Sequence, residues 1–279
     1  MKKKIYYQAP LPFVGQKRMF LKHFESILQD NIEGDGEDWT IVDVFGGSGL
    51  LSHTAKHLKP KARVIYNDFD DYCEKLKQIP EVNQLRRLLI EAIPSDIPSS
   101  GKIPNTVKAQ LIEIIKPFEN KVDVLFLSRW LLFSGQVSHS YDKLYRSNFH
   151  NNVRKSDYEI EGWFNGFEIT KQDFKALLPQ FKHSEKTLLL LDPPYFVTDC
   201  SGYKMEWYFD LVEFLKLIDL IRPPFIFFSS TKSEFIRFID WAIASKNNNY
   251  ATFEGYQRIA INAQINASVS YEDNLVFKF

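Results

Sequence analysis

The stretch Thr187–Leu191, followed directly by Asp192-Pro193-Pro194-Tyr195, constrains the fold more than any other part of the chain. Four consecutive leucines between a polar start and two prolines are typical of a short strand buried on both faces, as in a parallel sheet covered by helices. Proline cannot continue a strand ladder, so the strand ends at Asp192. Ligands bind at the carboxyl ends of strands in open α/β sheets. We therefore expect a ligand site around Asp192.

The residues after this strand suit the methylation of an exocyclic amine. An adenine amino group is a weak nucleophile, because its lone pair is delocalised into the ring. The Asp192 carboxylate and a backbone carbonyl fixed by the following Pro193 can accept both amine N–H groups, and Tyr195 offers a face for stacking. We predict catalytic roles for Asp192, Pro193, Pro194 and Tyr195. The alternative is a strand that ends in an ordinary Pro-Pro turn, with Asp192 as a solvated cap.

A glycine-rich turn follows the predicted strand 39–45. Residues 46–49 (Gly-Gly-Ser-Gly) lead into a predicted helix over 50–58, and such a turn lets a ligand approach the backbone closely. The next predicted strand, 63–66, is followed by Asp68, which is placed to hydrogen-bond ribose hydroxyls. The pattern fits NAD, FAD or S-adenosylmethionine. Because the turn lacks the full dinucleotide spacing of three glycines, it suits S-adenosylmethionine better.

Near the N-terminus, Phe13 and Lys17 precede an amphipathic helix that is predicted to begin near Arg18. Backbone N–H groups are free at the start of a helix. Taken locally, the pattern favours a solvated lysine at Lys17. The alternative places Lys17 and the aromatic ring of Phe13 beside a ligand pocket.

Toward the C-terminus, residues 250–261 and 275–279 are predicted as a closing pair of strands around a polar loop at 262–274.

The regular alternation of strands and helices stops between residues 73 and 186, where predicted helices alternate with connectors rich in Pro and Ser. Within residues 129–155, basic residues are interleaved with aromatic side chains, Asn and Gln. Basic residues suit phosphates, amides suit base edges, and aromatic rings suit stacking. The alternative is a helical subdomain with core aromatics and solvated charges. The residues expected to contact DNA are Arg129, Lys143, Arg146, Asn148, Arg154 and Lys155.

The composition narrows the class of protein. The 279 residues are 44% hydrophobic and 15% aromatic, which indicates a globular chain, and the net charge of zero excludes a global basic field. The two cysteines, Cys73 and Cys200, have no metal-ligand spacing, which favours a reducing compartment and no metal site. No secretory h-region follows the N-terminal lysines, and no apolar run reaches membrane-span length. We expect a soluble, cytoplasmic protein without membrane contact.

With these motifs in this order, the sequence resembles the Dam-like (D12 class) DNA adenine-N6 methyltransferases over nearly its whole length. Residues 13–17 (Phe-Val-Gly-Gln-Lys) correspond to the family's aromatic-x-Gly-Gly-Lys motif, and residues 43–49 (Asp-Val-Phe-Gly-Gly-Ser-Gly) to its Phe-x-Gly-x-Gly segment. Residues 66–68 (Tyr-Asn-Asp) match the acidic strand end, and residues 192–195 are the catalytic tetrapeptide without change. Gln16 departs from the pattern by replacing the second glycine of the first motif.

The resemblance implies an α/β fold: a Rossmann-like S-adenosylmethionine-dependent methyltransferase sheet in residues 1–72 and 187–279. A mainly helical target-recognition domain is implied at residues 73–186. The methyl group would pass directly to the N6 amine of an adenine flipped out of duplex DNA, without a metal. The partners implied are double-stranded DNA and a cognate restriction endonuclease, with the chain itself a monomer. The positions expected to bind S-adenosyl-L-methionine are Phe13, Lys17, Phe45, Gly46, Gly47, Gly49, Asp68 and Asp192.

Other functions stay open at this point. A similar tetrapeptide can serve another planar amine, such as an RNA adenine or a protein glutamine side chain. The chain can also be a relic that binds DNA without catalysis, or an NAD-dependent oxidoreductase. The recognition sequence does not carry over from the family, because residues 148–152 do not reproduce those with which Dam-type enzymes read GATC.

Overall fold

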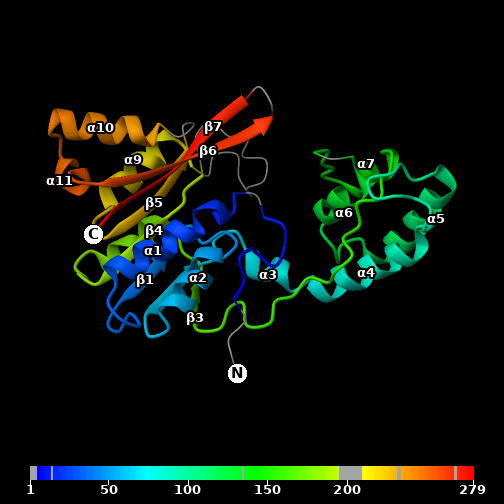
Figure 1. Cartoon of the computed structure of the whole chain (residues 1–279), viewed down its shortest axis with the longest axis horizontal. Helices are drawn as coiled ribbons and strands as arrows, with labels where there is room; N and C mark the ends of the chain where they lie inside the picture. The colour runs from blue at the N-terminus through cyan, green and yellow to red at the C-terminus, as the bar shows by residue number, and fades with distance from the viewer. Residues whose placement is uncertain (1–4, 14, 134, 195–208, 231–233, 267–268) are drawn as a thin grey trace. The chain divides into compact units, whose positions relative to one another are not determined.

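The computed structural model describes residues 5–13, 15–133, 135–194, 209–230, 234–266 and 269–279, with the backbone alone for 263–266 and 269–271. The chain forms two compact units. Unit 1 comprises Met1–Ala9, Phe13–Tyr72 and Gly162–Phe279, and unit 2 comprises Pro10–Pro12 and Cys73–Glu161. Figure 1 shows the elements of both units.

Unit 1 is built on a seven-stranded sheet in the order β3-β2-β1-β4-β5-β7-β6. The five strands from β3 to β5 are parallel, whereas β7 runs antiparallel to both β5 and β6. The leucine run forms the central strand β4 (Thr187–Leu191), which is buried at every position as predicted. The other strands are β1 (Thr40–Asp43), β2 (Arg63–Asn67), β3 (Phe167–Thr170), β5 (Phe225–Ser230), β6 (Gln257–Asn266) and β7 (Val269–Lys278).

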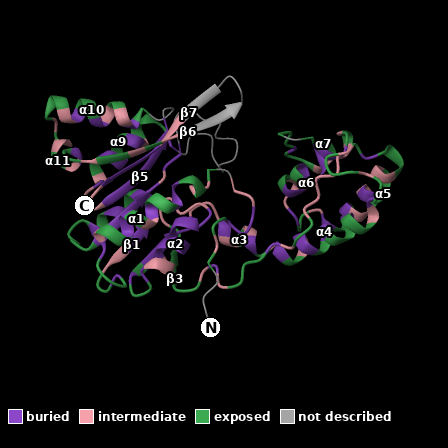
Figure 2. Cartoon of the chain, in the orientation of Figure 1, coloured by how far each residue is buried: buried purple, intermediate pink, exposed green. Residues whose placement is uncertain are grey.

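Helices cover both faces of the sheet. Side chains that alternate along the strands, such as Val42, Leu189 and Phe227, pack with the C-terminal helices of the unit into one apolar core. On the opposite face, Phe20 packs against Phe228 of β5, and α2 carries Ser52 to the end of β1. The buried residues accordingly follow the strands and the inner sides of the helices (Figure 2). The helices are η1 (Arg18–Phe20), α1 (Leu21–Asn31), α2 (Leu50–Leu58), α8 (Phe174–Leu177), η3 (Leu178–Phe181), α9 (Leu211–Leu220), α10 (Phe235–Ser245) and α11 (Tyr250–Phe253).

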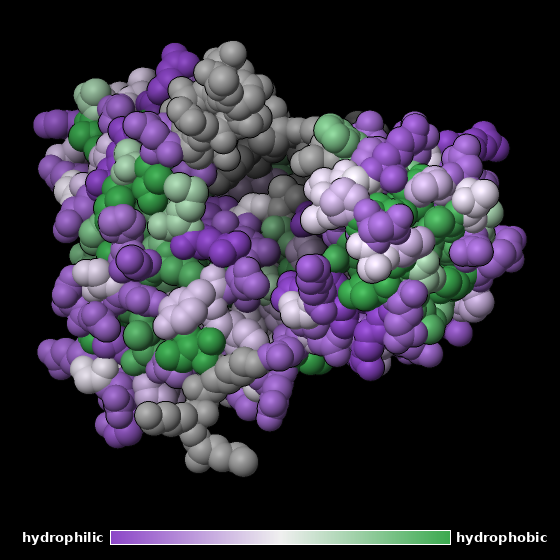
Figure 3. Space-filling model, turned by 45° about the vertical axis from the view of Figure 1, so that its right-hand side comes forward, coloured by the Kyte–Doolittle hydropathy of each residue, from purple (hydrophilic) through white to green (hydrophobic). Residues whose placement is uncertain are grey.

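Unit 2 is helical, with its own buried side chains. Fully buried residues such as Leu85 and Trp130 form its interior, and Lys102 and His150 make an isolated antiparallel bridge. On the visible face of this unit, hydrophilic residues surround a smaller hydrophobic area (Figure 3). Its helices are α4 (Ile79–Ala92), α5 (Asn105–Ile115), η2 (Lys116–Phe118), α6 (Val124–Leu131) and α7 (Tyr141–Arg146), and α3 (Tyr72–Leu76) begins at the last residue of the preceding unit 1 segment.

The structure differs from the sequence predictions at two places. Residues 162–186, predicted to belong to the insertion, lie in unit 1, because β3 pairs with β2 at the edge of the sheet. Residues 250–261, predicted as a strand, begin with α11, and the described residues of the predicted polar loop, 262–266 and 269–274, instead extend the β6–β7 hairpin. The hairpin's cross-strand pairing, which a single segment cannot reveal, overrides the polar composition of this stretch. Among the described residues, no helix has the length and hydrophobicity that crossing a membrane requires.

Candidate active site

Three predicted site segments meet at the carboxyl ends of the parallel strands β1, β2 and β4. Asp43, the last residue of β1, pairs with Tyr66 of β2 on one side and Leu190 of β4 on the other. Asp43, Tyr66 and Leu190 are thus in register. The glycine turn, Asp68 and Asp192 begin two or three residues after them, at the ends of neighbouring strands. The strand order also reverses here, since the chain passes from β1 outward to β2 and returns to β4 on the other side of β1. Ligands of doubly wound sheets bind at such a switch point.

Each glycine of the turn is favoured at its position for a different structural reason. A Cβ at Gly46 would lie 2.3 Å from Cε2 of Tyr66, so this glycine makes room for the Tyr66 ring. Gly47 has a φ of +50° and lies beside Phe13, whose Cζ would be 3.1 Å from an added Cβ. Gly49, with a φ of +74°, caps the N-terminus of α2. Packing against Tyr66 therefore requires Gly46, whereas Gly47 and Gly49 have backbone conformations that favour glycine, and Gly47 also lies beside the predicted cofactor-binding ring of Phe13.

Tyr66 connects this turn to Asp68. Its hydroxyl lies 2.8 Å from the carbonyl oxygen of Gly47 and 3.2 Å from Oδ1 of Asp68, so its single proton can be donated to either. The same Asp68 oxygen accepts a 2.6 Å hydrogen bond from the backbone N–H of Tyr72. Asp68 is thereby held in a fixed orientation at the end of β2. The sequence motif includes Tyr66, but sequence reasoning assigned it no role.

The N-terminal motif also lies at the carboxyl ends of these strands. Lys17 Nζ forms a 2.6 Å ion pair with Oδ2 of Asp192 and donates to the Gly15 carbonyl at 2.8 Å. The side chains of Lys17 and Asp192 are only 10% and 20% exposed. This pairing contradicts the local preference for a solvated lysine, because the attraction of a half-buried carboxylate is not visible in the local sequence.

Gln16, the departure from the family motif, braces the same segment. Its Oε1 accepts a 2.9 Å hydrogen bond from the backbone N–H of Ala9, and its Nε2 donates to the Phe13 carbonyl at 3.2 Å. Phe13 in turn contacts the Tyr72 ring edge-on, with ring centroids 5.5 Å apart. The glutamine therefore fixes the backbone that carries Phe13.

The electrostatics of Asp192 reflect burial and two opposed neighbours. Burial raises the pKa of the Asp192 carboxyl, Lys17 lowers it, and the negative charge of Asp273 raises it further. Asp273 lies opposite Ser230 in the β5–β7 pairing. Sequence reasoning missed Asp273, because it lies in the stretch that was predicted to be a loop.

Asp43 is a second buried carboxyl at the tip of β1, and the sequence prediction did not include it among the site residues. It is 1% exposed, and its Oδ2 accepts a 2.7 Å hydrogen bond from the Ser52 hydroxyl. Its Oδ1 has no hydrogen-bond partner among the described residues. Burial, reinforced by the charge of Asp192, raises the pKa of Asp43 to about 7, against the lowering effect of Ser52. The site therefore holds one carboxyl that changes charge near neutral pH.

Three of the remaining predicted residues of unit 1 are described. Phe45 packs against Phe174 and Phe209, with ring centroids 5.8 Å apart in each pair, and so contributes to the core beside the site. Pro193 and Pro194 are buried. Tyr195, predicted as the stacking face for the base, lies outside the described residues.

The predicted DNA-contacting residues all lie in unit 2. Arg129 of α6, Lys143 and Arg146 of α7, Asn148 and Lys155 are exposed, and Arg154 is half-buried. The aromatic side chains interleaved with them have different environments. Phe149 is fully buried, Tyr141 donates to the Val122 carbonyl, Tyr145 donates to Glu119 at 2.6 Å, and Phe133 is 58% exposed.

A seven-stranded sheet in this order, with a glycine turn, an acidic strand end and an Asp-Pro-Pro strand tip at its switch point, has a Rossmann-like methyltransferase fold. The chain is 51% identical over 278 residues to a protein of Haemophilus influenzae named "Putative methyltransferase", covering 99% of this chain and 94% of that protein. The chain therefore belongs to the same methyltransferase family. No protein-family model matches the chain.

Proposed function

We propose that the protein transfers a methyl group from S-adenosyl-L-methionine to the N6 amine of adenine in duplex DNA. The observation that carries this proposal is the position of Asp192. Its carboxylate follows the central strand at the switch point, paired with Lys17, beside the glycine turn and Asp68. A carboxylate followed by prolines at a strand tip suits an exocyclic amine that must be held by its hydrogens.

The residues around the turn fit S-adenosylmethionine. Gly47 offers a backbone without a side chain, the adjacent Phe13 ring offers an aromatic surface, and the fixed Asp68 carboxylate suits ribose hydroxyls. The buried Asp43 Oδ1, which has no partner within the described part of the chain, can accept a hydrogen bond from a bound donor. When bound, this cofactor supplies an activated methyl group on a positively charged sulfur. Phe13, the turn at residues 46–49 and Asp68 would hold it.

The protein's own residues would hold and activate the amine. An ionised carboxylate accepts hydrogen bonds at up to about four lone-pair sites, so Asp192 can accept from Lys17 and from the amine together. The ionised form accepts hydrogen bonds from the amine more strongly and at more sites than the protonated form, and burial disfavours it. Lys17, 2.6 Å away, compensates for that burial and also fixes the carboxylate in place. We therefore assign Asp192 as the group that contacts the amine and Lys17 as the residue that positions it.

Duplex DNA is the proposed substrate because unit 2 carries the basic and polar residues that a separate recognition element needs. Five of the six predicted contact residues are exposed, and all six belong to one compact unit. Phosphate contacts from Lys and Arg position a protein on DNA, while amides such as Asn148 suit base edges. We accordingly propose unit 2 as the target-recognition domain.

Methyl transfer from isotope-labelled cofactor to duplex DNA, RNA and protein tests this proposal. We expect transfer to duplex DNA, and a loss of about 100-fold or more in Asp192→Ala, because removal of a group that binds the reacting atoms typically costs this much. Asp219→Ala, which removes an exposed carboxylate of α9, is the matched control and should retain activity. Transfer only to RNA or protein, or an undiminished rate for Asp192→Ala, would reject the assigned chemistry.

A further inference from the structure

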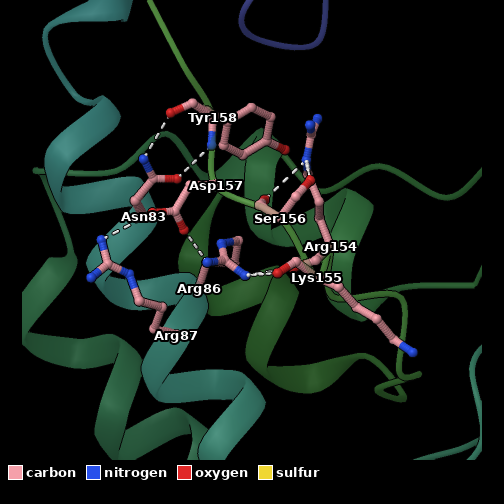
Figure 4. Close-up of polar contacts among 8 residues, drawn as sticks. All are labelled: Asn83, Arg86, Arg87, Arg154, Lys155, Ser156, Asp157 and Tyr158. Carbon is pink, nitrogen blue, oxygen red and sulfur yellow. Dashed lines mark hydrogen bonds and ion pairs between the residues drawn. The ribbon is translucent and has the colours of Figure 1, made fainter.

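Residues 154–158 of unit 2, termed here the anchored segment, form a loop attached to α4 by the side chains of Asn83, Arg86 and Arg87 (Figure 4). Asn83 exchanges two hydrogen bonds with the backbone of Tyr158. Its Nδ2 donates to the Tyr158 carbonyl at 3.0 Å, and its Oδ1 accepts from the Tyr158 N–H at 2.8 Å. Both backbone polar groups of Tyr158, at the C-terminal end of the segment, are thus paired with one side-chain amide.

Arg86 holds the other end of the anchored segment. Its side chain is only 4% exposed, and its Nη1 donates to the carbonyls of Arg154 and Lys155 at 2.9 and 2.8 Å. Its Nη2 forms an ion pair with Asp157, which also pairs with Arg87 at 3.2 Å. A buried guanidinium is destabilising unless its donors are paired. Its hydrogen bonds to two carbonyls and a carboxylate therefore hold this loop in one conformation.

The cationic side chains of the anchored segment, Arg154 and Lys155, are not used in its attachment to α4. Arg154 stacks on the Tyr158 ring, with its guanidinium carbon 4.6 Å from the centroid, and its Nε donates to the Ser156 carbonyl at 3.1 Å and hydroxyl at 2.9 Å. Lys155 is exposed and extends away from α4 (Figure 4). The Arg87 side chain, next to Asp157, is 59% exposed.

The side chains of the anchored segment and of the α4 residues that hold it carry a net positive charge. Four cations, Arg86, Arg87, Arg154 and Lys155, stand against the single carboxylate of Asp157, and the buried Arg86 already compensates that carboxylate. Two backbone carbonyls of the segment are occupied by Arg86, so cationic donors are what the segment presents outward. The next residue along the chain is the exposed Glu159, whose carboxylate offsets part of this charge.

We propose that the anchored segment binds the phosphodiester backbone of duplex DNA through Arg154 and Lys155, with Arg86 as the residue that positions them. The proposal rests on the proposed function in its choice of DNA as the partner. Lys and Arg neutralise phosphates, and a loop that is already fixed loses little conformational entropy when it binds. The segment therefore contributes affinity and register, without selecting the base sequence.

The salt dependence of DNA binding tests the segment directly. Fluorescence anisotropy with a labelled duplex would give the slope of log K against log salt for the wild-type protein, Lys155→Gln and the Arg154→Met/Lys155→Gln double variant. Each lost phosphate contact should reduce the slope by about 0.9, and weaken binding about 8-fold at about 0.1 M salt. Lys116→Gln, which removes an exposed lysine of the same unit and changes the charge by the same amount as Lys155→Gln, should leave the slope unchanged. Slopes of the segment variants equal to that of Lys116→Gln would overturn the proposal.

The positioning role of Arg86 needs a variant that retains the outward cations. Arg86→Lys keeps the charge but removes the forked contact with the two carbonyls, and should lower the slope although Arg154 and Lys155 are intact. Asn83→Ala releases only the Tyr158 end, and serves if Arg86→Lys does not fold. Circular dichroism would establish which variants are folded. A wild-type slope in a folded anchor variant would contradict the positioning role.

Methylation assays on the same samples separate this inference from the proposed function. If the wild-type protein methylates DNA and the segment variants bind DNA with its slope, the inference fails and the function stands. If the wild-type protein binds duplex DNA through the segment but transfers no methyl group to it, the function fails and the inference stands. A wild-type protein with no affinity for duplex DNA would refute both.

Discussion

Asp43→Asn should make the protein more stable at alkaline pH. The Asp43 carboxyl is fully buried at the end of β1, with Ser52 as the partner of Oδ2 and no partner for Oδ1 among the described residues. Ionised, it is a poorly compensated buried charge. Asparagine has nearly the same shape, and its carbonyl can still accept the hydrogen bond from Ser52, so the substitution removes the charge and little else.

The magnitude follows from the pKa of Asp43. The pKa is about 7 in the folded protein against 3.8 for the ordinary carboxyl. The folded state therefore binds more protons than the unfolded state between these values. The stability that protonated Asp43 contributes is fully present below about pH 4 and is lost as the pH rises through about 7. The difference between a pKa of about 7 and the ordinary 3.8 corresponds to about 4 kcal/mol.

Urea unfolding at two pH values measures this effect. Relative to the wild type, Asp43→Asn should gain about 3 kcal/mol in the free energy of unfolding between about pH 5 and about pH 8.5. Asp219→Asn, which changes an exposed carboxylate, should show no such gain. A constant difference between wild type and Asp43→Asn across this range would refute the assignment of a neutral buried carboxyl at the site.

Three further perturbations probe the site. Tyr66→Phe removes the hydroxyl that lies 2.8 Å from the Gly47 carbonyl; we expect calorimetry to give a cofactor Kd about 3- to 10-fold higher, with kcat nearly unchanged, as for one lost hydrogen bond. Gly46→Ala places a Cβ 2.3 Å from the Tyr66 ring and should lower the free energy of unfolding by about 1–3 kcal/mol; a variant of wild-type stability would show that the ring position is not needed. Lys17→Met removes the cation that lowers the pKa of Asp192, so the acidic limb of the methylation pH profile should move to higher pH, and an unmoved limb would contradict the role of ionised Asp192.

The central strands could be predicted because burial on both faces requires hydrophobic residues at consecutive positions of the sequence. A parallel strand covered on both faces is hydrophobic throughout, and Leu188–Leu191 shows this pattern without interruption. The predicted strands 39–45 and 63–66 correspond to β1 and β2, and the glycine turn lies between β1 and α2 as predicted. The position of the candidate site follows, because it depends on where those strands end.

The features that were missed depend on partners far away in the sequence. Asp273 lies near Asp192 only because β7 pairs with β5, and its polar stretch resembles a loop when taken alone. Lys17 and Asp192 are far apart in the chain, so their ion pair had no local signature. The edge strand β3 has a short, half-exposed sequence that resembles a connector, which is why the boundary of unit 2 was predicted too late in the chain.

The central claim, that Asp192 holds an adenine amine for methylation, is tested most directly by identifying the methylated nucleoside. Duplex DNA would be incubated with cofactor carrying an isotope-labelled methyl group, digested to nucleosides and measured by mass spectrometry. The wild-type protein should yield labelled N6-methyladenine, and Asp192→Ala essentially none. Label on cytosine alone, no label in DNA, or equal N6-methyladenine from both proteins would contradict the claim.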